Sequence, residues 1–364
     1  MTFFKKKHTV LFQYIALPCI IFSAICNAEE PNYAEIHYRI YEIERYSIDS
    51  LQDYAGAYTE LNRILRSCDY RFDEAYQLAL HNIFCNLDGS WETYEEDIKF
   101  YIERLSSIYQ RATLNMWLVN YTKRSCRKPP IKHHKELSLR PGLSIFCWGC
   151  ASPQTKNQMK EYIKLCFKNA LNKPKLDQQI TRELLQMEKR DQQARNIRNI
   201  QKSDAVMETI DLQNREKMDT IIARYQKIPG IREVGNAGMS AIEIILSHIG
   251  YDWIHKNMQH IERGIISGDL DPERMAWIVD YNWHQKHLAF IDGKMRIPYC
   301  QYGSLISSEA EATPVKNISH TNRIRKHWGL PPVEYYWQQH CIKFSDEKDF
   351  LQKHRFELFE PNKY

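Results

Sequence analysis

The sequence lacks the short motifs that mark several large enzyme classes. It contains no Gly-x-Ser-x-Gly nucleophile elbow, no Walker phosphate loop and no His-Glu-x-x-His zinc motif. The sequence therefore gives no support to an α/β-hydrolase, a P-loop nucleotidase or a zincin. It also lacks internal repeats and long low-complexity tracts, so neither a solenoid nor a largely disordered chain is indicated.

A strong net charge is lacking as well. The 364 residues carry a formal charge of +5, with 43% hydrophobic and 26% charged residues, as in ordinary folded proteins. Without residues 1–28 the charge falls to +2, because this segment holds Lys5, Lys6 and Lys7 and no acid. A near-neutral protein exerts no general attraction on nucleic acid, so we expect no nucleic-acid partner.

The first 28 residues have the three parts of a bacterial secretory signal peptide. A basic MTFFKKKH is followed by the apolar TVLFQYIALPCIIFSAI and by the small-residue site at Cys26-Asn27-Ala28. We expect cleavage after Ala28, a periplasmic or secreted mature protein, and no membrane span after cleavage. The alternative is an uncut anchor, because an apolar run of about seventeen residues almost spans a bilayer.

Cleavage would leave eight of the ten cysteines. An even number of cysteines in an exported protein favours disulfide bonds. Most of the eight precede residue 170, and for Cys147 and Cys150 a structural pairing is favoured over redox chemistry or zinc binding. The eight are Cys68, Cys85, Cys126, Cys147, Cys150, Cys166, Cys300 and Cys341.

The hydrophobic pattern predicts an all-α protein with two helical domains. Apolar residues recur every three or four positions, and the only short extended or β segment lies near 294–303. We expect a cysteine-containing domain at 29–172, a second helical domain at 173–345 and a C-terminal tail at 346–364. The predicted helices of the second domain span 176–200, 204–226, 237–249 and 252–266, and a fifth follows the capping residue Asp271.

Polar residues interrupt the apolar stripes of three successive predicted helices. Asp191 takes the place of the next apolar residue after Met187, and Arg195 follows one turn later. The other interruptions are Asp211 and Asn214 in the second helix and His248 in the third, whose stripe Asp252 would extend. Burying ions costs several kcal/mol each unless they are paired. The pattern therefore predicts either a shared polar site or a closed structural network.

The region from about 183 to 340 resembles a widespread bacterial domain of unknown function. The matching segments are Met187-x-x-x-Asp191-Gln192-x-x-Arg195, Asp211-x-x-Asn214, His248-x-x-x-Asp252, Gln301-Tyr302-Gly303, and Arg323 and Arg325 before Gly329-Leu330-Pro331-Pro332. The family's aspartate before the Gln-x-Tyr-Gly motif corresponds to either Asp280 or Asp292, because the spacing here departs from the family's. The resemblance implies no established activity, and it supports a site without identifying a reaction.

One hypothesis is a cell-envelope hydrolase or transferase. His248 would be the general acid or base, Asp191 or Asp211 would orient it, and Arg195 would hold an anionic group. The substrate would contact Asn214, Asp252, Gln301, Tyr302 and Arg325. The cofactor is unknown, and His248 with Asp252 provides too few ligands to predict a metal.

The alternative is a non-catalytic periplasmic protein that binds a ligand or a protein. The partner would then be an unknown envelope ligand or protein, and the sequence does not fix the oligomeric state. Convergence of His248, Arg195 and Gln301 on an open cleft would favour the enzyme.

Overall fold

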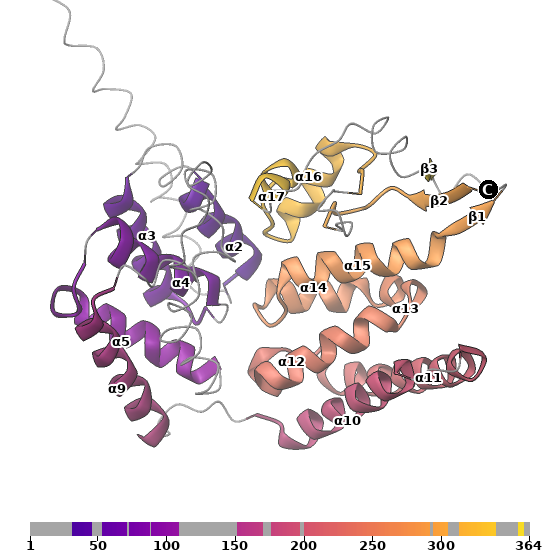
Figure 1. Ribbon diagram of the computed structural model, residues 1–364, viewed down its shortest axis with the longest axis horizontal. Coiled ribbons are helices and arrows are strands. Elements are labelled where there is room, and N and C mark those ends of the chain that lie inside the picture. The colour runs from indigo at the N-terminus through magenta and orange to yellow at the C-terminus, as the bar shows by residue number, and fades with distance from the viewer. Residues whose placement is uncertain are drawn as a thin grey trace, which may run out of the picture.

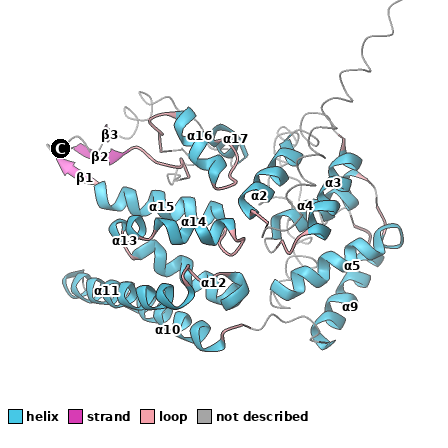
Figure 2. Cartoon of the chain, turned by 180° about the vertical axis from the view of Figure 1, so that it is seen from behind, coloured by secondary structure: helices cyan, strands magenta, loops and turns pink. Residues whose placement is uncertain are grey.

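The computed structural model is predominantly α-helical, with one small sheet (Figures 1 and 2), which confirms the predicted fold class. No helix among the described residues is both long and apolar enough to cross a membrane. The structure describes residues 31–45, 53–70, 73–87, 89–108, 151–169, 176–196, 200–291, 294–304, 313–339 and 356–359. The predicted signal peptide, Asp292 and Cys126, Cys147, Cys150 and Cys341 lie outside these residues.

The N-terminal helices share one apolar core. They are α2 (Tyr33–Glu42), α3 (Tyr54–Ser67), α4 (Asp73–His81), α5 (Trp91–Ile108) and α9 (Pro153–Asn169), and the π-turn η2 (Asn82–Asn86) continues α4. Their buried positions are mainly isoleucine, leucine and tyrosine, as the spacing of these residues predicts. α5 packs against α9, and α3 packs against α4 (Figure 1).

The C-terminal helices form a second core. They are α10 (Gln178–Arg195), α11 (Ile200–Tyr225), α12 (Ile231–His248), α13 (Tyr251–Lys256), α14 (Met258–Ile266), α15 (Pro272–His287), α16 (Ile318–His327) and α17 (Val333–Gln339). The first two make an antiparallel hairpin, because Arg195 pairs with Asp211 near one end and Asp177 pairs with Arg224 at the other. α12 packs against both α10 and α15, so its side chains face the hairpin as well as the core.

Gly235 divides the first turn of α12 from the rest of the helix. Its φ of 68° lies in the left-handed region, which favours glycine. The Thr181 hydroxyl of α10 donates to the Asp177 carbonyl at 2.8 Å, and its oxygen lies 3.3 Å from the Val234 carbonyl beside the break. The continuous helix therefore begins after Gly235, where the sequence predicts its start.

The sheet has three short strands in the order β1-β2-β3. β1 (Ala289–Ile291) runs antiparallel to β2 (Lys294–Pro298), and β3 (Phe356–Phe359) pairs parallel to β2. β2 lies within the predicted extended segment. The C-terminal tail supplies β3, so this part of the tail joins the C-terminal region.

Helix α2 belongs to both cores. Tyr33 is buried in the N-terminal core, whereas the next residue, Ala34, is buried in the C-terminal core. α2 also packs against α14 and α16. The buried residues of the first core precede the predicted boundary at 172–173, and nearly all those of the second core follow it. Ala34 is the buried residue of the second core that precedes the boundary.

No disulfide bond joins the described cysteine side chains, those of Cys68, Cys166 and Cys300, to one another. The disulfides expected from the cysteine count therefore remain a prediction for the other cysteines.

Candidate functional site

Asp191 is the centre of a polar cluster between α10, α11 and α12. Its side chain is fully buried and accepts four hydrogen bonds. Arg195 donates through Nε at 3.2 Å and Nη2 at 3.0 Å, Gln192 donates through Nε2 at 3.0 Å, and His248 Nδ1 lies 2.8 Å away. These contacts show how a carboxylate can occupy an apolar stripe: its oxygens accept four hydrogen bonds, two of them from the guanidinium of Arg195.

Arg195 connects this carboxylate to a second one on α11. Its Nη2 lies 2.7 Å from Asp211 Oδ1, and its Nη1 lies 3.4 Å from the sulfur of Met207. The Arg195 side chain is one quarter exposed. Arg195 therefore crosslinks the two helices of the hairpin and still faces solvent with part of its surface.

The two carboxyl groups differ in acidity although they share Arg195. Burial raises the pKa of Asp191, but the hydrogen bonds from His248 and Arg195 outweigh it, and the pKa falls below its ordinary value. For Asp211, burial dominates over the attraction of Arg195, and the pKa rises. Asp191 is therefore the stronger acid of the pair.

His248 is the last residue of α12 and is bonded on one side only. An ionised Asp191 accepts a hydrogen bond, so Nδ1 carries the proton in that contact. Among the described residues, Nε2 has no hydrogen-bond partner, and the side chain is 22% exposed. In the neutral ring, Nε2 therefore presents its lone pair to whatever enters from solvent.

Two further residues hold the end of α12 in place, and the sequence analysis missed both. Arg215 Nε donates to the Ile249 carbonyl at 2.7 Å, and Asn282 accepts from the Gly250 N–H at 3.0 Å. Asn282 also donates at 2.9 Å to the Leu246 carbonyl. Asn282 could have been found by the criterion that found Asp191, because it interrupts an apolar stripe on α15. Arg215 could have been found as Arg195 was, because it lies one turn after an aspartate, Asp211.

Asn214 lies one turn beyond Asp211 and is buried. Neither its amide nitrogen nor its amide oxygen has a hydrogen-bond partner among the described residues. Unsatisfied buried amides are rare in folded proteins. Asn214 is therefore an unusual polar residue beside the cluster, although its packed position gives a ligand no direct access.

The Gln301-Tyr302-Gly303 segment forms a separate buried network. Asp280 accepts hydrogen bonds of 2.8–2.9 Å from the backbone N–H groups of Gln301, Tyr302 and Ser304. Burial raises the pKa of Asp280 to about 6, against the opposing effect of these N–H groups and Arg325. Asp280 thus anchors the Gln301–Ser304 loop, and the choice between Asp280 and Asp292 as the family's aspartate stays a prediction because Asp292 lies outside the described residues.

Arg325 completes that network instead of facing a cleft. It is fully buried and donates to the carbonyls of Pro331 at 2.6 Å and Tyr302 at 2.8 Å. Tyr302 is itself buried against Trp328, with ring centroids 4.4 Å apart. In this arrangement both residues stabilise the loop and neither is open to a substrate.

The remaining two expected site residues make other contacts. Gln301 Nε2 donates to the Tyr251 hydroxyl at 3.1 Å. Asp252 is 82% exposed and pairs with Lys286. Within the described part of the chain, no group of three or more His, Cys, Asp or Glu residues is placed to hold a metal ion. The structure brings Asp191, Arg195, Asp211 and His248 together through direct contacts, and Asp252, Gln301, Tyr302 and Arg325 contact other residues. Among the described residues no contact joins Gln301 to His248 or Arg195, so only two of the three residues whose convergence would favour an enzyme share one cluster.

Comparisons of the chain with protein-family models, with curated proteins and with solved structures found no match.

Proposed function

We propose that this protein is an exported enzyme of the bacterial cell envelope, a hydrolase or transferase in which His248 transfers a proton. One observation supports this above all others. His248 Nδ1 is held 2.8 Å from a buried carboxylate, while Nε2 has no partner among the described residues and the ring is partly open to solvent. Proton transfer requires such a nitrogen, because one already bonded to another protein group could not take a proton from a substrate.

The Asp191–His248 pair has the arrangement of a general base and its orienting group. Asp191 fixes the ring and stabilises the imidazolium that forms when Nε2 takes a proton. Nε2 would accept the proton of a water molecule or a substrate hydroxyl as its oxygen attacks, and would return it to the leaving group. If water attacks, the reaction is a hydrolysis, and if a substrate hydroxyl attacks, it is a group transfer. The same site can therefore serve either reaction.

Arg195 is the proposed contact for negative charge. Its Nε and Nη2 are occupied by carboxylates, but it remains one quarter exposed and its Nη1 contacts the neutral sulfur of Met207. Nη1 can therefore donate to an anionic group or to charge that develops during the reaction. Asp211 holds the guanidinium from the opposite helix, so it is a positioning residue in this proposal.

The test compares His248→Ala with a matched control, His320→Ala, which changes an exposed histidine on α16. Purified proteins are incubated with chromogenic ester, phosphate and glycoside substrates and with envelope fractions analysed by mass spectrometry. We expect wild type and the control to share an activity that His248→Ala reduces by about 10²–10⁴-fold, the usual contribution of a general base. A folded His248→Ala protein that retains full activity would contradict the proposal.

Export is tested independently. Mass spectrometry of secreted or periplasmic material should show a mature N-terminus at Glu29. A chain that keeps residues 1–28 would contradict the export proposal and leave the assignment of His248 unaffected.

A further inference from the structure

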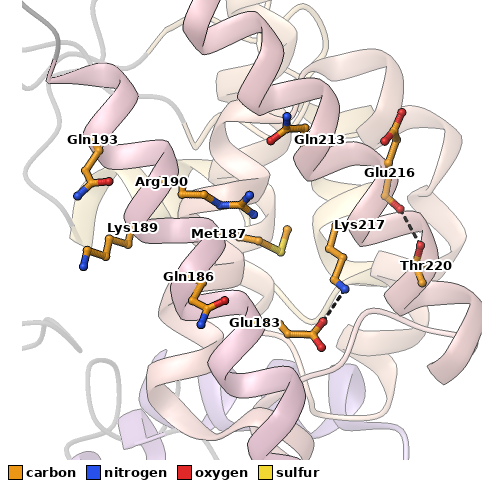
Figure 3. A pocket seen from close by; sticks show the side chains of 10 residues that line it. All are labelled: Glu183, Gln186, Met187, Lys189, Arg190, Gln193, Gln213, Glu216, Lys217 and Thr220. Atoms are coloured by element: carbon orange, nitrogen blue, oxygen red, sulfur yellow. Dashed lines mark hydrogen bonds and ion pairs between the residues drawn. The ribbon is translucent and has the colours of Figure 1, made fainter.

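A groove of about 790 Å³ lies between α10 and α11, and none of its lining residues belongs to the candidate functional site (Figure 3). Its lining is largely polar and includes three glutamines, while Met187 provides a buried apolar floor. The lining positions of α10 run from 183 to 193, which corresponds to about 15 Å of helix. The groove is therefore long enough for about three turns of another helix.

The α10 wall of the groove is positively charged. Lys189 and Arg190 are both exposed, and neither has an ion-pair partner among the described residues. Figure 3 shows the Arg190 side chain extending from α10 toward α11. Lys217, by contrast, is neutralised by Glu183 at 2.7 Å. The available positive charge is thus concentrated on one wall, where it would favour carboxylates.

Exposed apolar residues border the same hairpin. Leu185, Val206 and Leu212 account for three of the six large hydrophobic residues that are exposed in the described part of the chain, and Leu212 is 49% exposed. At 100° per residue, Val206 falls on the face of α11 that lines the groove, whereas Leu212 lies about 90° from that face and Leu185 lies about 120° from the lining face of α10. Val206 is therefore the exposed apolar residue that a partner in the groove could cover, and the charge of the α10 wall is the main indication of a binding surface.

We propose that the α10–α11 groove is a docking site for an acidic amphipathic helix of a partner protein. A third helix fits the groove between two antiparallel helices, as in helical bundles. Its carboxylates would face Arg190 and Lys189, and its apolar stripe would meet Met187 at the floor of the groove and Val206 on the lining face of α11. This docking does not depend on the proposed chemistry at His248.

The test uses a labelled synthetic peptide as probe. The peptide has leucines at helical i, i+3, i+4 spacing and glutamates on its flanks, and a matched peptide carries lysine at every glutamate position. By fluorescence anisotropy we expect the full chain to bind the acidic peptide more tightly. The double variant Lys189→Glu, Arg190→Glu should weaken binding by at least about tenfold. The control Arg182→Glu, which changes an exposed cation of α10 outside the groove, should bind like wild type.

Three results would overturn the proposal once circular dichroism has shown that the variants are folded. The first is a lack of charge specificity, shown by equal binding of the lysine peptide or by an equal loss in the Arg182→Glu control. The second is displacement of the acidic peptide by inorganic phosphate alone, which would indicate a simple anion site. The third is self-association of the wild-type chain that the double variant abolishes, which would make a second copy the occupant.

Discussion

The two hydrophobic cores of this protein treat charge in opposite ways. The N-terminal core buries isoleucine, leucine and tyrosine, and its tyrosines use neutral contacts such as Tyr76 to the Tyr70 carbonyl at 2.7 Å. Its carboxylates that bond tyrosines, such as Asp97 beside Tyr58, lie partly exposed at the rim. This half is stabilised by apolar burial with few buried ions.

The C-terminal core instead buries charged groups completely. Asp191, Asp269, Asp280 and Arg325 are each at most 1% exposed. Each carboxylate among them is surrounded by donors; Asp269, for example, accepts from Arg232, Lys227 and Ser267. Apolar residues of similar size would often be equally stable at such positions. The difference indicates that the C-terminal half keeps its charges because they fix geometry.

The strongest test of this comparison is Arg325→Met. Removing the guanidinium leaves Asp280 buried without its opposite charge and frees the Tyr302 carbonyl. We expect a loss of about 3–5 kcal/mol in the free energy of unfolding, measured by urea denaturation. Arg323→Met on the same helix changes an exposed arginine and should cost less than about 0.5 kcal/mol. Equal losses of unfolding free energy in the two variants would show that the buried charge of Arg325 stabilises the fold no more than an exposed one.

Asp191→Asn should have the next largest effect, on stability as well as on activity. The amide weakens the bonds from His248 and Arg195, and we expect a loss of about 2 kcal/mol at pH 7. Because the pKa of Asp191 is lowered in the folded state, its stabilising contribution exists above the ordinary value of 3.8 and disappears as the pH falls through the folded pKa. Thermal denaturation should therefore show wild type and variant converging at acidic pH.

The exposed Asp204→Asn is the control for that experiment. A difference between wild type and Asp191→Asn that stayed constant down to pH 2 would show that the Asp191 charge is not what stabilises the cluster.

Glu243→Gln reverses the direction of the pH effect. Burial raises the pKa of Glu243 to about 7, with Asp271 acting in the same direction. The protonated form therefore stabilises the fold fully below the ordinary value of 4.5, and this contribution is lost as the pH rises through 7. At pH 8.5 we expect the glutamine variant to be more stable than wild type by about 1–2 kcal/mol. An identical pH dependence in both proteins would contradict this.

The sequence predicts the helices well because their apolar stripes are local signals. The break at Gly235 falls where glycine is required. The separation of α13 from α14 at Asn257 was not predicted, because it depends on the buried Asn257 amide, which donates to the Trp253 carbonyl at 3.0 Å. The apolar stripe continues across this point and does not reveal it.

The candidate site likewise has residues that a local pattern reveals and residues that depend on tertiary contacts. Asp191, Arg195, Asp211 and His248 could be selected because each interrupts or flanks a stripe within its own helix, and they do contact one another. The burial of Tyr302 and Arg325 could not be read in this way. Asp280 accepts hydrogen bonds from backbone N–H groups that lie more than twenty positions later in the chain, and these bonds hold the loop that covers both residues. Such a tertiary contact leaves no periodic pattern in the sequence.

Tyr58→Phe should have the smallest effect and addresses the N-terminal half. The hydroxyl donates to Asp97, which is also held by Arg66 at the solvent-exposed edge. Because Asp97 keeps Arg66 and can reach water, we expect a loss of only about 0.5–1 kcal/mol in unfolding free energy, with no shift in its pH dependence above pH 5. A loss as large as that of Arg325→Met would mean that the N-terminal core also depends on a charged group, and that the two cores are not built differently.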